Sequence, residues 1–92
     1  MATILKKWDT TNVPEGYADW WLGPTDGATA KDLPANERLQ AIFQARCPNA
    51  GEMIIDRGDH HYRVVYLPSA TPRAARDAFV AGVEEEISRT SA

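Results

Sequence analysis

The fold of this chain is decided by the stretch from Glu52 to Pro68, which reads EMIIDRGDHHYRVVYLP. Two apolar runs rich in β-branched and aromatic residues flank the dipeptide Gly58-Asp59, a sequence that suits a two-residue hairpin turn. The stretch therefore predicts an antiparallel hairpin with strands over 52–57 and 60–67.

The two faces of this hairpin are expected to differ, because successive side chains of a strand point to opposite sides. A two-residue turn pairs Ile55 with Tyr62. The face expected to meet the core then collects Met53, Ile55, Tyr62, Val64 and Tyr66. The face expected to meet solvent collects Glu52, Ile54, Asp56, His61, Arg63 and Val65.

An amphipathic helix is predicted on each side of the hairpin. The first covers about 33–47, with Asp32 as its N-cap and Pro34 in its first turn. The second covers about 72–89 and starts at Thr71-Pro72, a favourable N-cap and first-turn pair. Its apolar residues return at every fourth position, at Ala75, Phe79, Val83 and Ile87. Gly82 inside this helix indicates close packing against a neighbour.

The N-terminal part of the chain is expected to add strands to the hairpin. Residues 3–8 alternate weakly, and 14–22 fits either a strand or a short helix, with the aromatic residues favouring a strand. The predicted fold class is α+β, with a small antiparallel sheet of three or four strands. Both helices are expected to pack on one face of that sheet, within a single domain over 1–92.

The adjacent residues Trp20 and Trp21 raise the functional question. In a strand they point to opposite faces, so one of them should lie on the sheet face that the helices leave open. An apolar centre with a charged rim is typical of a protein–protein contact. The predicted contact residues are Tyr17, Trp20, Trp21, Ile54, Arg63 and Val65, with Glu84, Glu85 and Glu86 as a second, acidic surface. The alternative is that both tryptophans fill the core, or that the loop 23–32 covers the open face.

Composition limits the partners and the location. The chain has 92 residues, a net charge of −3 and a single cysteine, Cys47. The acidic balance argues against general affinity for nucleic-acid backbones, which needs clustered lysine and arginine. A lone cysteine suits a reducing cytoplasm, and the sequence has no apolar run long enough to span a membrane. We therefore expect a cytoplasmic protein.

The segment DRGDHH brings Asp56, Asp59, His60 and His61 together and invites a metal or acid–base interpretation. Two adjacent histidines on a strand would point apart, whereas metal ligands must converge on one ion. The sequence therefore predicts no metal, no cofactor and no catalytic residue.

The leading hypothesis is a small cytosolic module, a monomer or homodimer, that acts by binding another protein. It could be an accessory subunit, or an inhibitor such as phages encode against host defence systems, anti-CRISPR proteins included; size, acidity and the lack of motifs suggest this setting. One alternative is a nucleic-acid-binding sheet that uses Trp8, one of the paired tryptophans and Arg63. Another is a metal-assisted enzyme that uses Glu52, Asp56 and His61.

Overall fold

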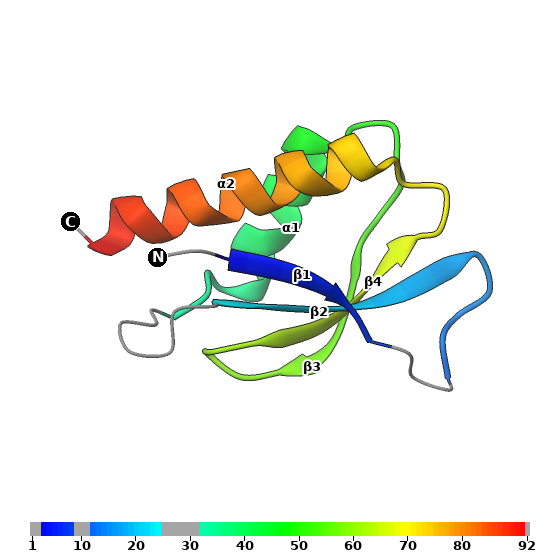
Figure 1. Ribbon diagram of the computed structural model, residues 1–92, viewed down its shortest axis with the longest axis horizontal. Coiled ribbons are helices and arrows are strands. Elements are labelled where there is room, and N and C mark those ends of the chain that lie inside the picture. The colour runs from blue at the N-terminus through cyan, green and yellow to red at the C-terminus, as the bar shows by residue number, and fades with distance from the viewer. Residues whose placement is uncertain (1–2, 9–11, 25–31, 92) are drawn as a thin grey trace.

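The computed structural model shows a four-stranded antiparallel sheet with two helices on one of its faces (Figure 1). It describes residues 3–8, 12–24 and 32–91. This architecture confirms the predicted α+β fold class. The elements in chain order are β1 (Thr3–Lys7), β2 (Tyr17–Pro24), α1 (Asn36–Arg46), β3 (Ile54–Gly58), β4 (Arg63–Pro68) and α2 (Arg73–Ser91).

The sheet has the strand order β1-β2-β4-β3, so the paired tryptophans lie on a central strand. The run that could have formed a strand or a short helix is the strand β2, and it pairs with β1 on one side and β4 on the other. A central strand is flanked by hydrogen-bonded neighbours on both sides. Each of its side chains therefore points either to the helix face or to the opposite face of the sheet.

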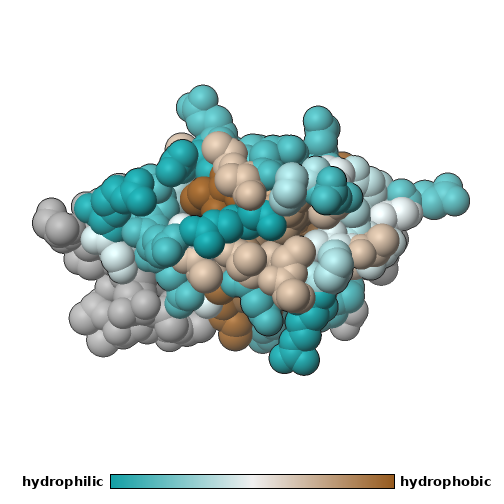
Figure 2. Space-filling view, turned by 90° about the horizontal axis from the view of Figure 1, so that it is seen from above, coloured by the Kyte–Doolittle hydropathy of each residue, from teal (hydrophilic) through white to brown (hydrophobic). Residues whose placement is uncertain are grey.

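The core lies between the sheet and the helices. Phe43 of α1 and Phe79 of α2 are fully buried and meet edge to face, with ring centroids 5.5 Å apart. Leu22, Val65 and Leu67 meet them from the central strands. Seen from the helix side, hydrophilic residues surround an apolar area in the middle of the surface (Figure 2). Within the described residues, no helix is both long and apolar enough to cross a membrane.

The hairpin forms in a different register from the predicted one. Gly58 pairs with Arg63, so the connection is the four-residue loop Asp59–Tyr62 rather than a two-residue turn. An irregularity between Ile55 and Arg57 shifts the register again, and Ile55 faces Val65. The predicted pairing of Ile55 with Tyr62 is therefore wrong. A slip by an odd number of residues moves every side chain of a strand to the other face.

The consequence is that β4 turns the opposite side toward the helices. Val65, predicted on the solvent face, is fully buried in the core beside Ile55. Val64 and Tyr66, predicted on the core face, lie on the face away from the helices. Tyr66 pairs there with Ile54, which was correctly placed on that face.

The helices begin later than their sequence signals suggest. Helix α1 starts at Asn36 after Ala35, so Asp32 is not its N-cap and Pro34 precedes its first turn. The Thr71 hydroxyl is buried without a hydrogen-bond partner, so it does not cap α2. The expectation for Gly82 is confirmed: a Cβ atom there would lie 2.7 Å from Cγ2 of Ile42, which shows how closely the two helices approach.

Candidate functional site

The sheet face opposite the helices, here called the open face, is the first candidate site. Strand alternation and the observed register place on it Ile4, Lys6, Tyr17, Asp19, Trp21, Ile54, Val64 and Tyr66. Ile4 and Ile54, on the two edge strands, are 37% exposed and are among the most exposed large hydrophobic residues described. Asp19, Val64 and Tyr66 on the two central strands are buried, so the most exposed apolar groups of this face lie at its edges.

An aromatic stack forms the centre of the open face. Trp21 and Tyr62 lie nearly parallel, with an interplanar angle of 16° and ring centroids 6.3 Å apart, and both are half-buried. The indole also lies against Gly23, where a Cβ atom would come within 2.6 Å of its Cη2. Any larger residue at position 23 would push the indole off the sheet. The absence of a side chain at Gly23 thus allows the Trp21 indole to lie against the backbone of β2.

Charged groups border this stack. Lys6, Trp21, Val64 and Arg57 form one row across the four strands, so a cation stands at each end of the row. The next row contains Asp19, which is 1% exposed and accepts a hydrogen bond of 2.6 Å from Nζ of Lys7. An apolar centre with charges at its margins is the usual anatomy of a protein-binding patch.

Trp20, predicted as a contact together with Trp21, lies on the helix side. It packs against the core beneath α2, with the Arg76 guanidinium 4.5 Å from its ring centroid and Nζ of Lys7 at 5.9 Å. A cation over an indole is an attractive arrangement. The two tryptophans therefore point to opposite faces, as strand geometry requires, and Trp21 is the one on the open face.

Two other predicted contact residues also lie away from the open face. Val65 has no exposed surface, so it cannot meet a partner. The half-buried Arg63 donates from Nε to Oδ1 of Asn36 at 2.8 Å and from Nη1 to the carbonyl oxygen of Tyr62 at 3.0 Å. These bonds tie the start of β4 to the start of α1. The half-buried Tyr17 lies at one end of β2, opposite Pro68.

The acidic run of α2 is engaged within the chain. Glu84 accepts a hydrogen bond from the backbone N–H of Thr3 at 2.9 Å, and Glu85 pairs with Arg46. Glu86 accepts a hydrogen bond from Arg38 at 2.9 Å, which lowers the pKa of its carboxyl from the ordinary value. These contacts join α2 to β1 and α1, so they have a role in packing.

The loop Asp59–Tyr62 carries a second candidate site. His60 and His61 lie in the loop rather than on a strand, and their ring centroids are 4.1 Å apart, so the expectation that they point apart is wrong. Oδ1 of Asp32 is 3.9 Å from Nδ1 of His61. Donor atoms of Asp32, His60 and His61 all lie within 4.8 Å of one another. We call these three residues the loop triad.

The metal group considered in the sequence does not form. Asp56 accepts a hydrogen bond from the Tyr66 hydroxyl at 3.0 Å and pairs with Arg57 at 3.2 Å. Among the described residues, the loop triad is the only group of three or more potential ligands that converges, and it excludes Glu52 and Asp56. The proposed combination of Glu52, Asp56 and His61 is therefore wrong as a metal site.

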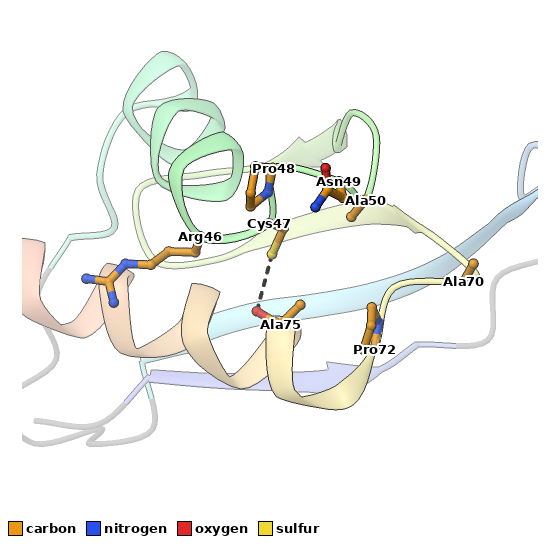
Figure 3. A pocket seen from close by; sticks show the side chains of 8 residues that line it. All are labelled: Arg46, Cys47, Pro48, Asn49, Ala50, Ala70, Pro72 and Ala75. Carbon is orange, nitrogen blue, oxygen red and sulfur yellow. Dashed lines mark hydrogen bonds between the residues drawn. The ribbon is translucent and has the colours of Figure 1, made fainter.

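An apolar pocket of about 360 Å³ lies where α1 ends and α2 begins (Figure 3). Sγ of Cys47 points toward it and donates a hydrogen bond to the carbonyl oxygen of Ala75 at 3.3 Å. Cys47 is 3% exposed, and burial raises the pKa of its thiol. Since the thiolate is the nucleophilic form, both effects make this cysteine a structural residue.

We expect Cys47 to react slowly while the chain is folded. A raised pKa leaves less thiolate at any given pH, and reagents reach the buried sulfur only during local opening. The rate of modification by an aromatic disulfide at pH 8 should be on the order of tenfold or more below the rate in guanidinium chloride. Equal rates in the two conditions would contradict the buried position.

Sequence reasoning did not assign several residues of these two sites, Tyr62 of the stack and Asp32 of the loop triad among them. Tyr62 was placed on the core face because the loop length was wrong. His60 was considered and rejected because it was placed on a strand rather than in the loop. Asp32 was missed because the triad joins segments far apart in sequence, through a 2.8 Å hydrogen bond from the N–H of Leu33 to the carbonyl oxygen of His60. No local pattern contains that contact. Comparison with protein-family models, with curated proteins and with solved structures finds no match to this chain.

Proposed function

We propose that this protein is a small protein-binding module that docks its partner on the open face. The observation that carries the proposal is the half-buried stack of Trp21 and Tyr62 on the sheet face that the helices do not cover. Accessible aromatic and aliphatic groups gathered on one face of a small domain can mark an interaction site.

The residue types on this face suit a binding anchor. Tryptophan and tyrosine are enriched among the interface residues that contribute most to affinity, because they bury a large area with few rotatable bonds. The stack holds both rings before the partner arrives, so less conformational entropy is lost on binding. Ile4 and Ile54 extend the apolar surface to the two edges of the sheet.

The charges suggest the chemistry of the partner. Lys6 and Arg57 stand at opposite ends of the row that contains Trp21, about three strand spacings apart, or roughly 14 Å. A protein with an apolar segment bordered by carboxylates would match this arrangement. The neighbouring Asp56 already pairs with Arg57, so Lys6 is the stronger determinant of the two.

The setting we propose is the cytoplasm, where a lone thiol remains reduced. A small acidic chain with an aromatic docking face suits either an accessory subunit or an inhibitor of a larger enzyme. Phage-encoded inhibitors of host defence, such as anti-CRISPR proteins, are one such class. In each case the chain acts by occupying a surface of its partner, without chemistry of its own.

A nucleic-acid-binding sheet is the second candidate, favoured by the proximity of Lys6 to a half-buried aromatic stack. Bases can stack on such rings, and lysine can contact the backbone. This function predicts retention on single-stranded DNA that weakens steeply with salt. Failure to bind at low salt would exclude it.

The test of protein docking is a charge placed on the open face. Ile54→Glu should weaken binding of the purified partner at least about 30-fold, because a carboxylate would be desolvated in an apolar contact. It should change the free energy of unfolding by only about 1 kcal/mol, since the position is exposed. Ala74→Glu, an exposed position on α2, adds the same charge to the helix side and serves as the matched control.

The partner is identified by a photo-crosslinking amino acid at position 54, with position 74 as the comparison, followed by mass spectrometry of native-host lysate. The candidate is then purified and its affinity measured by calorimetry for the wild type and both variants. Loss of affinity with Ile54→Glu but not with Ala74→Glu supports the proposal. Equal affinity for the wild type and Ile54→Glu, or crosslinking only from position 74, would overturn it.

A further inference from the structure

We propose that the loop triad of Asp32, His60 and His61 is a binding site for a divalent transition-metal cation of the zinc class. Two imidazoles and one carboxylate form a donor set that suits Zn²⁺, Co²⁺, Ni²⁺ or Cu²⁺ better than Mg²⁺ or Ca²⁺, which prefer oxygen ligands. This site is separate from the stack of the open face.

The donor atoms are already near the spacing that a metal requires. Zinc bonds nitrogen and oxygen ligands at about 2.0–2.2 Å, so tetrahedral ligand atoms lie roughly 3.4 Å apart. The triad donors lie within 4.8 Å of one another, and the pair from Asp32 and His61 is at 3.9 Å. The side chains of Asp32 and His61 are 69% and 56% exposed, so they can rotate inward without disturbing the core.

The backbone holds the three residues in place from both sides. The N–H of Leu33 donates to the carbonyl oxygen of His60 at 2.8 Å, which fixes the Asp32 segment beside the loop. The N–H of Asp59 donates to the carbonyl oxygen of Tyr62 at 2.9 Å and closes the loop. Oδ1 of Asp59 accepts the N–H of His61 at 2.8 Å.

Asp59 also contributes charge. Its carboxylate lies beside the two histidines, because Oδ1 accepts the backbone N–H of His61. A second carboxylate beside the loop favours a bound cation by electrostatic attraction. Three protein ligands leave at least one coordination position for water.

The composition of the chain makes the test unusually direct. The chain contains two histidines, both in the triad, and one cysteine, which is buried at Cys47. Zinc affinity is measured on tag-free protein by competition with a chromophoric chelator, and Co²⁺ absorption reports the coordination geometry. We expect one ion per chain.

The variants distinguish Zn²⁺ binding by the loop triad from nonspecific attraction of the cation to acidic side chains. His60→Ala and His61→Ala should each weaken Zn²⁺ binding at least about 100-fold, because the loss of a direct ligand exceeds the 10–100-fold cost of losing a second-shell partner. Asp32→Asn should weaken it at least about tenfold. Asp56→Asn makes the same chemical change on the hairpin that carries the two histidines, and it should leave affinity unchanged, as should Cys47→Ser.

Imidazole resonances in ¹H–¹⁵N spectra provide a readout that does not depend on affinity. Both rings should shift on Zn²⁺ addition in the wild type, with the rest of the spectrum showing a folded chain for every variant. The proposal is overturned if only one ring responds, if Zn²⁺ binds the wild type no more tightly than His60→Ala, or if Asp56→Asn weakens binding as much as Asp32→Asn.

Discussion

Phe79→Ala is expected to lower the free energy of unfolding by about 3–5 kcal/mol. Phe79 is fully buried on α2 and meets Phe43 of α1 edge to face, at 79°. Truncation removes both the transfer free energy of the ring and its contact with Phe43, and it leaves a cavity that the packed sheet cannot fill. For a domain of this size the expected fall in Tm is about 4–8 °C for each kcal/mol.

The control for Phe79→Ala is Trp8→Ala, which truncates a larger ring at a position that is 39% exposed. It should change the free energy of unfolding by about 1 kcal/mol or less. Urea unfolding of both variants, followed by circular dichroism, measures the difference. If Phe79→Ala lowered the free energy of unfolding by less than about 1 kcal/mol, Phe79 would not be packed in the core as the structure places it.

The helix stripe that contains Phe79 could be predicted because its information is local. Apolar residues at every fourth position place Phe79, Val83 and Ile87 on one side of any helix, and all three are buried in the core. The close approach marked by Gly82 follows from the same local pattern. The beginnings of the helices were less predictable, because the signals at Asp32 and Thr71 compete with tertiary contacts.

The faces of the hairpin could not be predicted from the same kind of pattern. Either loop length leaves apolar residues on both sides of β4, since Val64, Val65, Tyr66 and Leu67 are all apolar or aromatic and all buried. The alternation that normally fixes register is therefore absent from this strand. The choice depends on the irregularity near Asp56 and on the backbone conformation at Gly58.

The candidate sites also combine features that follow from local sequence with features that depend on contacts between distant segments. The split of Trp20 and Trp21 between two faces follows from strand geometry alone. Which indole lies on the open face depends on the sheet order and on where α2 lies, and both are non-local. The loop triad depends on the meeting of Leu33 with His60, so it becomes visible only in the fold.

Gly58→Ala is the second large effect that we expect, with a loss of about 2–3 kcal/mol or more in the free energy of unfolding. Gly58 has a φ of +145°, a region that is essentially confined to glycine. An added Cβ atom would lie 2.2 Å from the carbonyl oxygen of Tyr62 and 2.6 Å from Cα of Arg63. Both obstacles are backbone atoms, so no rotation of a side chain relieves the clash, and the end of the hairpin must open.

Gly16→Ala isolates the contribution of the clash. Gly16 also has a positive φ, of +85°, but nothing lies within 4 Å of the Cβ position, so its replacement should cost only about 1 kcal/mol of backbone strain. Because Gly58 precedes the loop that carries His60 and His61, opening the hairpin should also weaken Zn²⁺ binding, whereas Gly16→Ala should leave it intact. Urea unfolding and zinc titration of the two variants test both expectations. Equal stability losses in the two variants would show that the chain does not hold Gly58 against the backbone of Tyr62, and the register of β3 on β4 would then have to differ.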